Sequence, residues 1–244
     1  GVRLLLTARK SDWPPDLGFQ PLSLEVFSAP ESLAFLRRRL PPERATDQAL
    51  NGLAERLGHL PLAEELAGRY LARHARLSVE AYLARLERVL DDRAMRAWRA
   101  ELGSPTKHDL DLARTFALSW QEIKDEGARR LLRGAGYCAA NEPIPVALFQ
   151  GALLEQAAGL EQDACDEALD GLVGLGLLRR TDGQEGPAIH PLLAEFARAQ
   201  DATAAEAGEE SVLPALVAAL SGQSYEALVA GIPARFASLR PHLE

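Results

Sequence analysis

Apolar residues in the first half of the chain recur every three or four positions, which is the spacing of one face of an α-helix. Four such segments lie between residues 28 and 92, and short turns separate them. Their apolar positions are Leu33, Leu36 and Leu40, then Leu50, Leu53 and Leu57, then Leu62, Leu66 and Tyr70, and finally Val79, Tyr82, Leu83, Leu86 and Leu90. The pattern predicts a bundle of four helices over residues 28–92.

The ends of these predicted helices carry residues that commonly begin or end a helix. Ser28 and Glu31 have the spacing of a capping box, in which side chains bond the unpaired N–H groups of the first turn. Pro41-Pro42 stops the first helix, and Gly58 suits the left-handed position that ends the second. Pro61 fits the first turn of the third helix, where its missing N–H costs nothing. The local sequence therefore agrees with the apolar spacing.

Two segments before the bundle read as strands. Residues 4–9, Leu-Leu-Leu-Thr-Ala-Arg, form an apolar run that ends at Arg9, as a buried strand would. Residues 22–26 alternate apolar and polar positions like a short half-buried strand. Because the chain opens inside the first of these strands, we expect it to be a piece of a longer protein. We assign residues 1–27 to the end of an α/β core.

The second half of the chain predicts a different module. Residues 93–107 are polar and read as a linker. Helical spacing follows near 109–123, 126–138, 146–154 and 165–175, and a small hairpin is expected over 176–190. Helices followed by a hairpin are the order of a winged helix, which we place at residues 108–200. Residues 201–244 are expected to be helical, with breaks at Gly222, Gly231 and Pro233.

Composition narrows the class of protein. The 244 residues are 47% hydrophobic and 25% charged, and no apolar run approaches the length of about 20 residues that spans a bilayer. No signal peptide is visible. The two cysteines, Cys138 and Cys165, have neither metal-ligand spacing nor a disulfide framework. We therefore expect a cytoplasmic protein that is mainly α-helical and has no membrane partner.

The corner between the second and third predicted helices reads Gly58-His59-Leu60-Pro61-Leu62-Ala63. Together with the strand that ends at Arg9, it resembles the helical-lid half of an NB-ARC, or STAND-type, nucleotide switch. In that family the strand arginine senses the terminal phosphate, and the proline of the corner packs against adenine. The resemblance therefore implies nucleotide contacts for Arg9 and Pro61. Ala8 stands where many members have serine, which leaves the arginine in place.

A third position matches the same family beyond the predicted hairpin. His190 stands where the family has its Met-His-Asp motif, whose histidine reaches the β-phosphate of ADP. Here Ile189-His190-Pro191 keeps the histidine and lacks the aspartate. The resemblance thus adds His190 to the predicted nucleotide site. The residues alone leave simpler roles open: a solvated strand end for Arg9, a turn for Pro61 and a helix cap for His190.

The phosphate-binding half of such a site is missing from the sequence. A phosphate-binding loop reads Gly-x-x-x-x-Gly-Lys-Ser/Thr, and none of the three lysines has that context. We therefore predict no catalytic residue and no metal site in the chain, and no tight nucleotide binding by the chain alone. The resemblance implies that an intact parent holds ADP in the closed state. Exchange for ATP, with Mg²⁺, would then move the winged helix and allow self-association.

Two other classes of protein remain open: a winged-helix transcription regulator, and a helical interaction scaffold without nucleotide. DNA binding is disfavoured because the predicted third helix, residues 165–175, carries Asp166, Glu167 and Asp170 and no cation. The net charge of −8 has the wrong sign for a general nucleic-acid surface.

The basic run, Arg37-Arg38-Arg39, is expected to be a solvated helix end. Residues 239–243 resemble the lead-in to tetratricopeptide repeats in bacterial family members.

Overall fold

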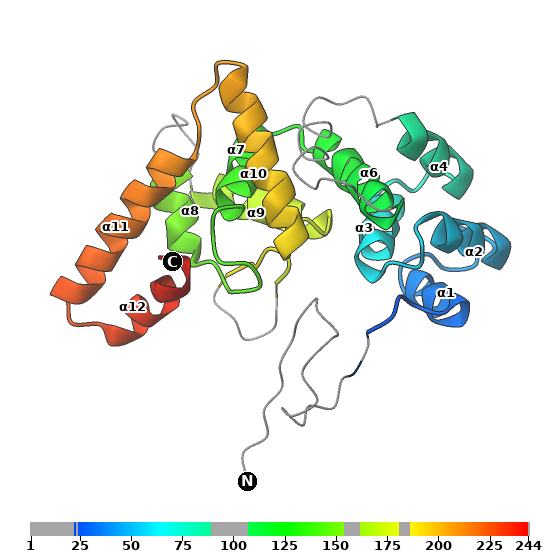
Figure 1. Cartoon of the computed structure of the whole chain (residues 1–244), viewed down its shortest axis with the longest axis horizontal. Coiled ribbons are helices and arrows are strands. Elements are labelled where there is room, and N and C mark those ends of the chain that lie inside the picture. The colour runs from blue at the N-terminus through cyan, green and yellow to red at the C-terminus, as the bar shows by residue number, and fades with distance from the viewer. Residues whose placement is uncertain (1–21, 23, 89–106, 154–161, 181–185, 244) are drawn as a thin grey trace, which may run out of the picture.

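The chain is mainly α-helical in the computed structural model, which describes residues 22, 24–88, 107–153, 162–180 and 186–243. Figure 1 shows α1 to α4 at one end of the molecule and α11 and α12 at the other, with the remaining helices between them. They are α1 (Ala29–Arg37), α2 (Asp47–Arg56), α3 (Pro61–Arg73), α4 (Val79–Arg88), α6 (Lys107–Gln121), α7 (Glu126–Ala135), α8 (Val146–Leu153), α9 (Gln162–Gly174), α10 (Pro191–Glu206), α11 (Leu213–Val229), α12 (Pro233–Leu239) and the short 3-10 helix Arg240–His242. The predicted fold class is confirmed. Arg9 and its predicted strand lie outside the described residues.

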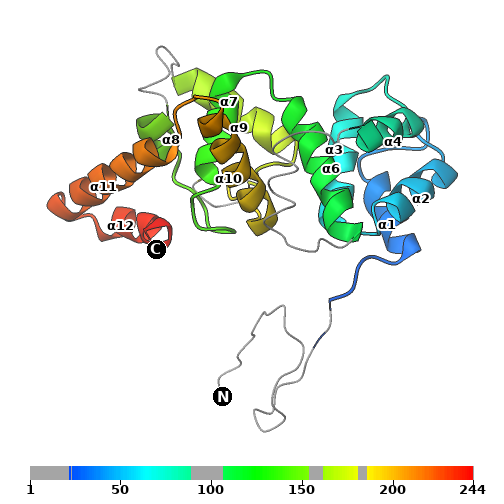
Figure 2. The same ribbon diagram turned by 45° about the horizontal axis from the view of Figure 1, so that its top comes forward.

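The bundle predicted as a lid, called the lid bundle below, consists of α1 to α4, gathered at one end of the molecule in both views (Figures 1 and 2). Most leucines of its predicted stripes are buried, among them Leu36, Leu50, Leu53 and Leu66, whereas Leu33, Leu62 and Leu83 are partly buried. The capping box forms at the start of α1, where the Ser28 N–H donates to Glu31 Oε2 at 2.8 Å. The predicted helices and their buried faces thus agree with the structure over residues 28–88.

Helix α6 belongs to both halves of the molecule. It packs against α3 and α4 of the bundle and lies between them and the second module in Figure 2. Its aromatic side chains also reach α10: Phe116 lies 5.7 Å and Trp120 lies 6.2 Å from the ring of Phe196. Edge and tilted aromatic pairs at this separation are favourable. One hydrophobic core therefore continues from the bundle into the second module.

The second module has helices followed by a short bridged segment, the order predicted for a winged helix, and is called the winged helix below. Helix α7 packs against α8, α9 and α10, and the wing follows α9. Arg179 and Ala188 form an antiparallel bridge, with N···O distances of 2.9 and 2.8 Å. The Ile144 N–H joins this small sheet by donating to the carbonyl of Pro187 at 2.8 Å. The expected hairpin is therefore present as a single bridge among the described residues, and its turn at 181–185 lies outside them.

The C-terminal helices differ from the sequence prediction at one glycine. Helix α11 continues through Gly222, where we expected a break. A glycine inside a helix costs about 1 kcal/mol relative to alanine, which a helix of this length absorbs. The break comes at Gly231, which has φ of 65°, and Pro233 then starts α12.

The prediction of a half-buried strand at residues 22–26 is wrong for the part that the structure describes. Residues 22 and 24–26 adopt no regular structure, and Leu22 and Leu24 are 83% and 89% exposed. An alternating pattern gives a strand only where a neighbouring strand supplies hydrogen bonds. No strand among the described residues lies beside this segment, so its alternation has no partner.

The basic run agrees with the predicted solvated helix end at Arg38, which is exposed, and differs from it at the two neighbouring arginines. Arg37 bonds Asp47 and donates to the carbonyl of Leu40 at 2.9 Å. Arg39 Nε donates to Glu65 Oε2 at 3.0 Å. These side chains connect α1 to α2 and α3 instead of extending into solvent, because acidic partners face them across the bundle.

Among the described residues, no helix combines the length and apolarity needed to cross a membrane.

Glycine contacts give a stability test with a matched control. A Cβ added at Gly136 would lie 2.9 Å from Ala197 Cβ and 3.0 Å from the Ala194 carbonyl, where α7 meets α10. Gly136→Ala should therefore lower the free energy of unfolding by about 1–3 kcal/mol through overpacking. Gly52→Ala, in open space on α2, should instead raise it by about 0.5–1 kcal/mol. Urea denaturation measures both, and equal effects of the two substitutions would contradict the α7–α10 packing.

Candidate functional site

The corner that contains Pro61 is held rigidly from three sides. Gly58 and His59 both have left-handed backbone, with φ of 65° and 55°. The His59 N–H donates to the Ala54 carbonyl at 2.9 Å, and the His59 carbonyl accepts from the Phe27 N–H at 3.0 Å. The His59 ring lies against Ser32, with Nδ1 and Oγ 2.9 Å apart. These contacts leave Pro61 exposed at the first position of α3.

A buried carboxyl group lies one turn beyond this corner. Glu64 is fully buried in α3, and neither of its carboxyl oxygens has a hydrogen-bond partner. Burial raises the pKa of Glu64, and the nearby Ser32 hydroxyl and His59 offset only part of that effect. The sequence reading missed Glu64. The signal was present, because Leu60, Glu64, Ala67 and Leu71 follow the apolar spacing of α3.

His190 caps α10. Its Nδ1 accepts a hydrogen bond from the Leu192 N–H at 3.2 Å, so the helix-cap role left open by the sequence is observed. In the neutral ring this bond assigns the proton to Nε2, which is then a donor. The first turn of a helix also attracts anions. The phosphate contact stays a prediction.

The predicted site residues lie in different parts of the molecule. Pro61 begins α3 in the lid bundle and His190 begins α10 in the winged helix, whereas Arg9 lies outside the described residues. The polar contacts between the modules lie about two turns or more beyond Pro61, in the second half of α3. The junction of the modules is therefore a separate place from the Pro61 corner.

One part of this junction is built by Arg69. Its Nη1 donates to the Val173 carbonyl at 2.8 Å, in the last turn of α9, where a cation also favours the helix dipole. Its Nε donates to Glu65 at 2.6 Å. Gly176, with φ of 79°, gives Arg69 room, because a Cβ there would lie 2.7 Å from Arg69 Cδ. Arg69 thus ties α3 to the end of α9.

The other part of the junction is Glu122, which directly follows α6. The Tyr70 hydroxyl donates to Glu122 Oε1 at 2.8 Å, and His74 Nε2 lies 3.1 Å from Glu122 Oε2. Arg85 Nη1 donates to the Tyr70 hydroxyl at 3.1 Å. Burial opposes the charge of Glu122, but the bonds from Tyr70 and His74 outweigh it and lower the pKa of Glu122. The carboxylate is therefore charged at neutral pH.

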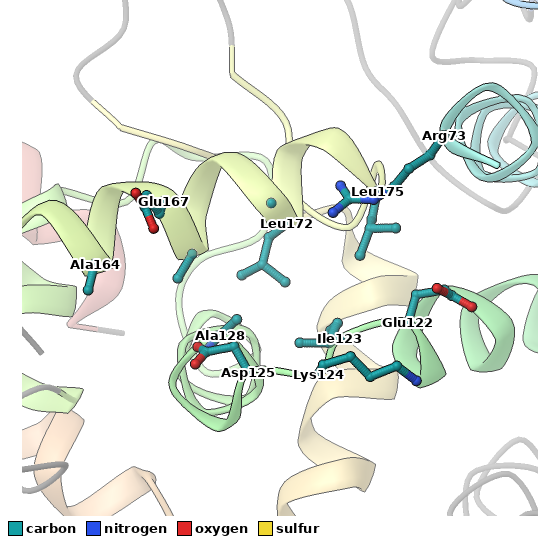
Figure 3. Close-up of a pocket in the computed structure, with 12 residues that line it drawn as sticks. Arg73, Glu122, Ile123, Lys124, Asp125, Ala128, Ala164, Glu167, Leu172 and Leu175 are labelled. Atoms are coloured by element: carbon teal, nitrogen blue, oxygen red, sulfur yellow. The ribbon is translucent and has the colours of Figure 1, made fainter. Parts of the chain in front are cut away.

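A cavity of about 390 Å³ lies beside Glu122, between the modules (Figure 3). Arg73 of α3 enters from one side, and Leu172 of α9 and Leu175, which directly follows α9, lie opposite Ile123. The rim carries both signs of charge: the cations are Arg73 and Lys124, and the carboxylates are Glu122, Asp125 and Glu167. The mixed charge does not select one class of ligand.

The helix that would enter DNA in a winged-helix regulator is α9. Asp166, Glu167 and Asp170 are exposed on it, and Arg180 of the wing pairs with Asp170 at 2.5 Å. Carboxylates on this surface repel phosphate, and the pairing of Arg180 removes a cation from DNA contact. Glu167 and further residues of α9 also line the junction cavity.

A scan against protein-family models gave no match to the chain, and a search of curated proteins gave none either. The resemblance to NB-ARC proteins therefore rests on the sequence motifs at Arg9, Pro61 and His190 and stays a prediction.

Two adjacent glutamates of α3 provide a stability test. Glu64→Leu should raise the free energy of unfolding at pH 7 by about 1–3 kcal/mol, because it removes an unpaired buried carboxyl group. Glu65→Leu should lower it, since Glu65 binds Arg39 and Arg69.

Chemical denaturation as a function of pH distinguishes the two groups. The raised pKa of Glu64 destabilises the fold as pH rises through it, so the gain from Glu64→Leu should shrink in acid. Burial raises the pKa of Glu65, but the two arginines outweigh burial and lower it. The loss from Glu65→Leu should therefore be largest at neutral pH and fade as pH falls below about 4.5. A destabilising Glu64→Leu would show that the carboxyl group is satisfied in solution.

Proposed function

We propose that this chain is the lid and winged-helix part of an NB-ARC, or STAND-type, signalling switch that responds to ADP and ATP and controls self-association. The observation that carries the proposal is the corner at Gly58–Pro61. Two successive left-handed residues and three anchoring contacts hold an exposed proline at the start of α3. A rigid apolar surface of this kind suits stacking against an adenine ring.

His190 supplies the second support. It stands at the start of a 16-residue helix, whose N–H groups and dipole favour a phosphate. In the proposal the Nε2–H of His190 donates to the β-phosphate of ADP while Nδ1 continues to cap α10. Arg9 adds the contact to the terminal phosphate. In the proposal the three residues belong to a predicted core strand, the lid and the winged helix, so a nucleotide that touches all three favours one arrangement of these parts.

The proposal assigns the phosphate-binding loop and the Mg²⁺ ligands to a nucleotide core outside this chain. ADP or ATP would bind between that core and the residues above. A cytoplasmic location is part of the proposal, and the two unpaired buried cysteines are consistent with a reducing compartment. Protein partners, including further copies of the same protein, would bind in the ATP state.

The interaction scaffold is the second candidate function, and α11 is the observation that favours it. Apolar side chains on α11 are strongly exposed, among them Val217 at 52%, Tyr225 at 70% and Leu228 at 64%. Exposed apolar side chains that share one helix often mark a protein interface. A scaffold of this kind would need no nucleotide.

The coding sequence upstream of Gly1 gives the first test. The switch requires a Gly-x-x-x-x-Gly-Lys-Ser/Thr loop within about 150 residues before this position. An intact gene without such a loop removes the proposal and leaves the scaffold.

Calorimetric titration of ADP into the longer protein gives the second test, with prolines that have the same structural role as controls. Pro61 and Pro233 are both exposed first residues of helices. Pro61→Ala should weaken ADP binding about tenfold because it removes a ring face from the nucleotide, whereas Pro233→Ala should leave the affinity unchanged. Unchanged ADP affinity in both variants would show that Pro61 only begins α3 and does not contact the nucleotide.

The same titration separates the two roles of His190. Asparagine is a good helix cap, so His190→Asn should keep the stability of α10 and still lose about tenfold in ADP affinity. Wild-type affinity in this variant would show that His190 only caps the helix.

A further inference from the structure

Helix α11 presents an apolar side to solvent. A surface helix normally carries polar or charged side chains opposite its buried stripe. The buried stripe of α11 is present as expected, at Leu216, Leu220 and Ala227. The opposite side is also apolar or small, and we call it the α11 face; its exposed residues are Leu213, Pro214, Val217, Ala218, Ser221, Gly222, Tyr225, Leu228 and Val229.

Charge is nearly absent from this part of the chain. From residue 211 to residue 234 the sequence has one charged residue, Glu226, and its carboxylate lies 3.5 Å from the Arg235 guanidinium. Helix α9 shows the usual contrast, because Asp166, Glu167 and Asp170 are exposed on it. The whole chain has a net charge of −8, so the α11 face is a neutral area on an acidic protein. Two copies can meet there with little repulsion between the surfaces in contact.

The α11 face is accessible to another helix. Helix α11 packs against α8 and α12, and its face stays exposed beside them. In both views α11 lies at the end of the molecule away from the lid bundle (Figures 1 and 2). A Cβ added at Gly222, in the middle of the helix, would meet nothing within 4 Å. A partner helix can therefore lie along α11 without displacing a described element.

The size of this surface suits a weak dimer. Its large apolar side chains, with Ile232 just after the helix, are 39–70% exposed. A fully exposed side chain of this kind presents roughly 150–200 Å², so together they leave roughly 500 Å² of apolar surface in water. Two copies would bury roughly 1,000 Å² against each other, which is close to the lower limit for a specific interface. An affinity in the micromolar range is expected from such an area.

The order of residue sizes along the α11 face is symmetric about Ser221. Large residues precede it as far as Val217, small residues surround it, and large residues resume at Tyr225. If two copies of α11 lie antiparallel with Ser221 opposite Ser221, Val217 of each copy lies opposite Tyr225 of the other. Small residues at the crossing point let the two helices approach closely. A surface that matches its own reverse forms a two-fold dimer, because every contact is then made twice.

We propose that the α11 face is a homodimer interface, in which α11 of a second copy packs antiparallel across it with Ser221 at the centre. A neutral, apolar partner fits because a charged helix would lose hydration there without gaining an opposite charge. The proposal names the occupant of the surface that favours the scaffold function. It does not rest on the nucleotide switch, since the dimer forms without ADP or ATP.

Sedimentation equilibrium of the 244-residue chain without nucleotide tests the dimer. The wild type should change from monomer to dimer with a Kd between about 1 and 100 μM. Leu228→Glu should weaken this association at least about tenfold, because it buries a charge in each half of the interface. Leu24→Glu is the matched control, since Leu24 is an exposed leucine outside the α11 face, and it should leave the Kd unchanged.

Two results of this experiment would overturn the proposal. One is a wild-type chain that stays monomeric up to about 200 μM, which would leave the α11 face to a partner of another kind. The other is a dimer that Leu228→Glu and Leu24→Glu affect equally. Both leucines are exposed, so both variants should fold, and circular dichroism checks that their helix content matches the wild type.

Disulfide crosslinking tests the antiparallel register. Ser221→Cys should give a covalent dimer on oxidation, because the two cysteines meet at the two-fold axis. Ala230→Cys is the control: it is exposed nine residues further on, so the two copies of the cysteine would be about 27 Å apart. Cys138 and Cys165 can stay, because burial raises the pKa of their thiols to about 12 and about 11.

Crosslinking of Ala230→Cys in place of Ser221→Cys would contradict the proposed pairing. None of these measurements involves ADP, and the predictions for Pro61 and His190 are tested by ADP affinity alone. Failure of the dimer and failure of the nucleotide switch are therefore distinguishable.

Discussion

The contact of the second half of α3 with the winged helix is the interaction on which the arrangement of the molecule depends. Arg69 reaches the end of α9, and Tyr70 and His74 reach Glu122 at the end of α6. Apolar residues of the same helix, Leu66 and Leu71, are buried in the bundle. Helix α3 therefore serves the lid core with one face and the junction with another, and both depend on its orientation.

The Pro61 corner depends on the same helix. Pro61 is the first residue of α3, and the left-handed pair Gly58 and His59 fixes the direction from which the chain enters it. A rotation of α3 would move Pro61 and the junction together. This gives a physical route by which a ligand at the corner and the position of the winged helix can influence each other, because both bias one rigid element.

Much of the fold could be predicted from the sequence because most helices have clear apolar stripes and clear ends. The capping box at Ser28 and the proline at position 61 are examples in which local chemistry fixed a boundary. The errors came where the outcome depended on partners distant in sequence. The alternation at residues 22–26 needed a neighbouring strand, and Arg37 and Arg39 found acidic partners on α2 and α3.

In the candidate site, too, residues that belong to a local motif could be predicted, and residues brought together from distant parts of the chain could not. Motifs pointed to Pro61 and His190, and the structure shows why each can hold its position. The junction was missed because Tyr70, His74 and Glu122 are separated by up to 52 residues and share no motif. Glu64 was missed although its spacing placed it on the buried face of α3, because a carboxylate is rarely expected in an apolar core.

The central claim is that α3 and α6 join the lid bundle and the winged helix into one cooperative body. Differential scanning calorimetry of the 244-residue chain tests it most directly. The shared core from Leu66 to Phe196 predicts a single unfolding transition, in which the calorimetric and van't Hoff enthalpies agree. Two resolved transitions, one for each module, would contradict it.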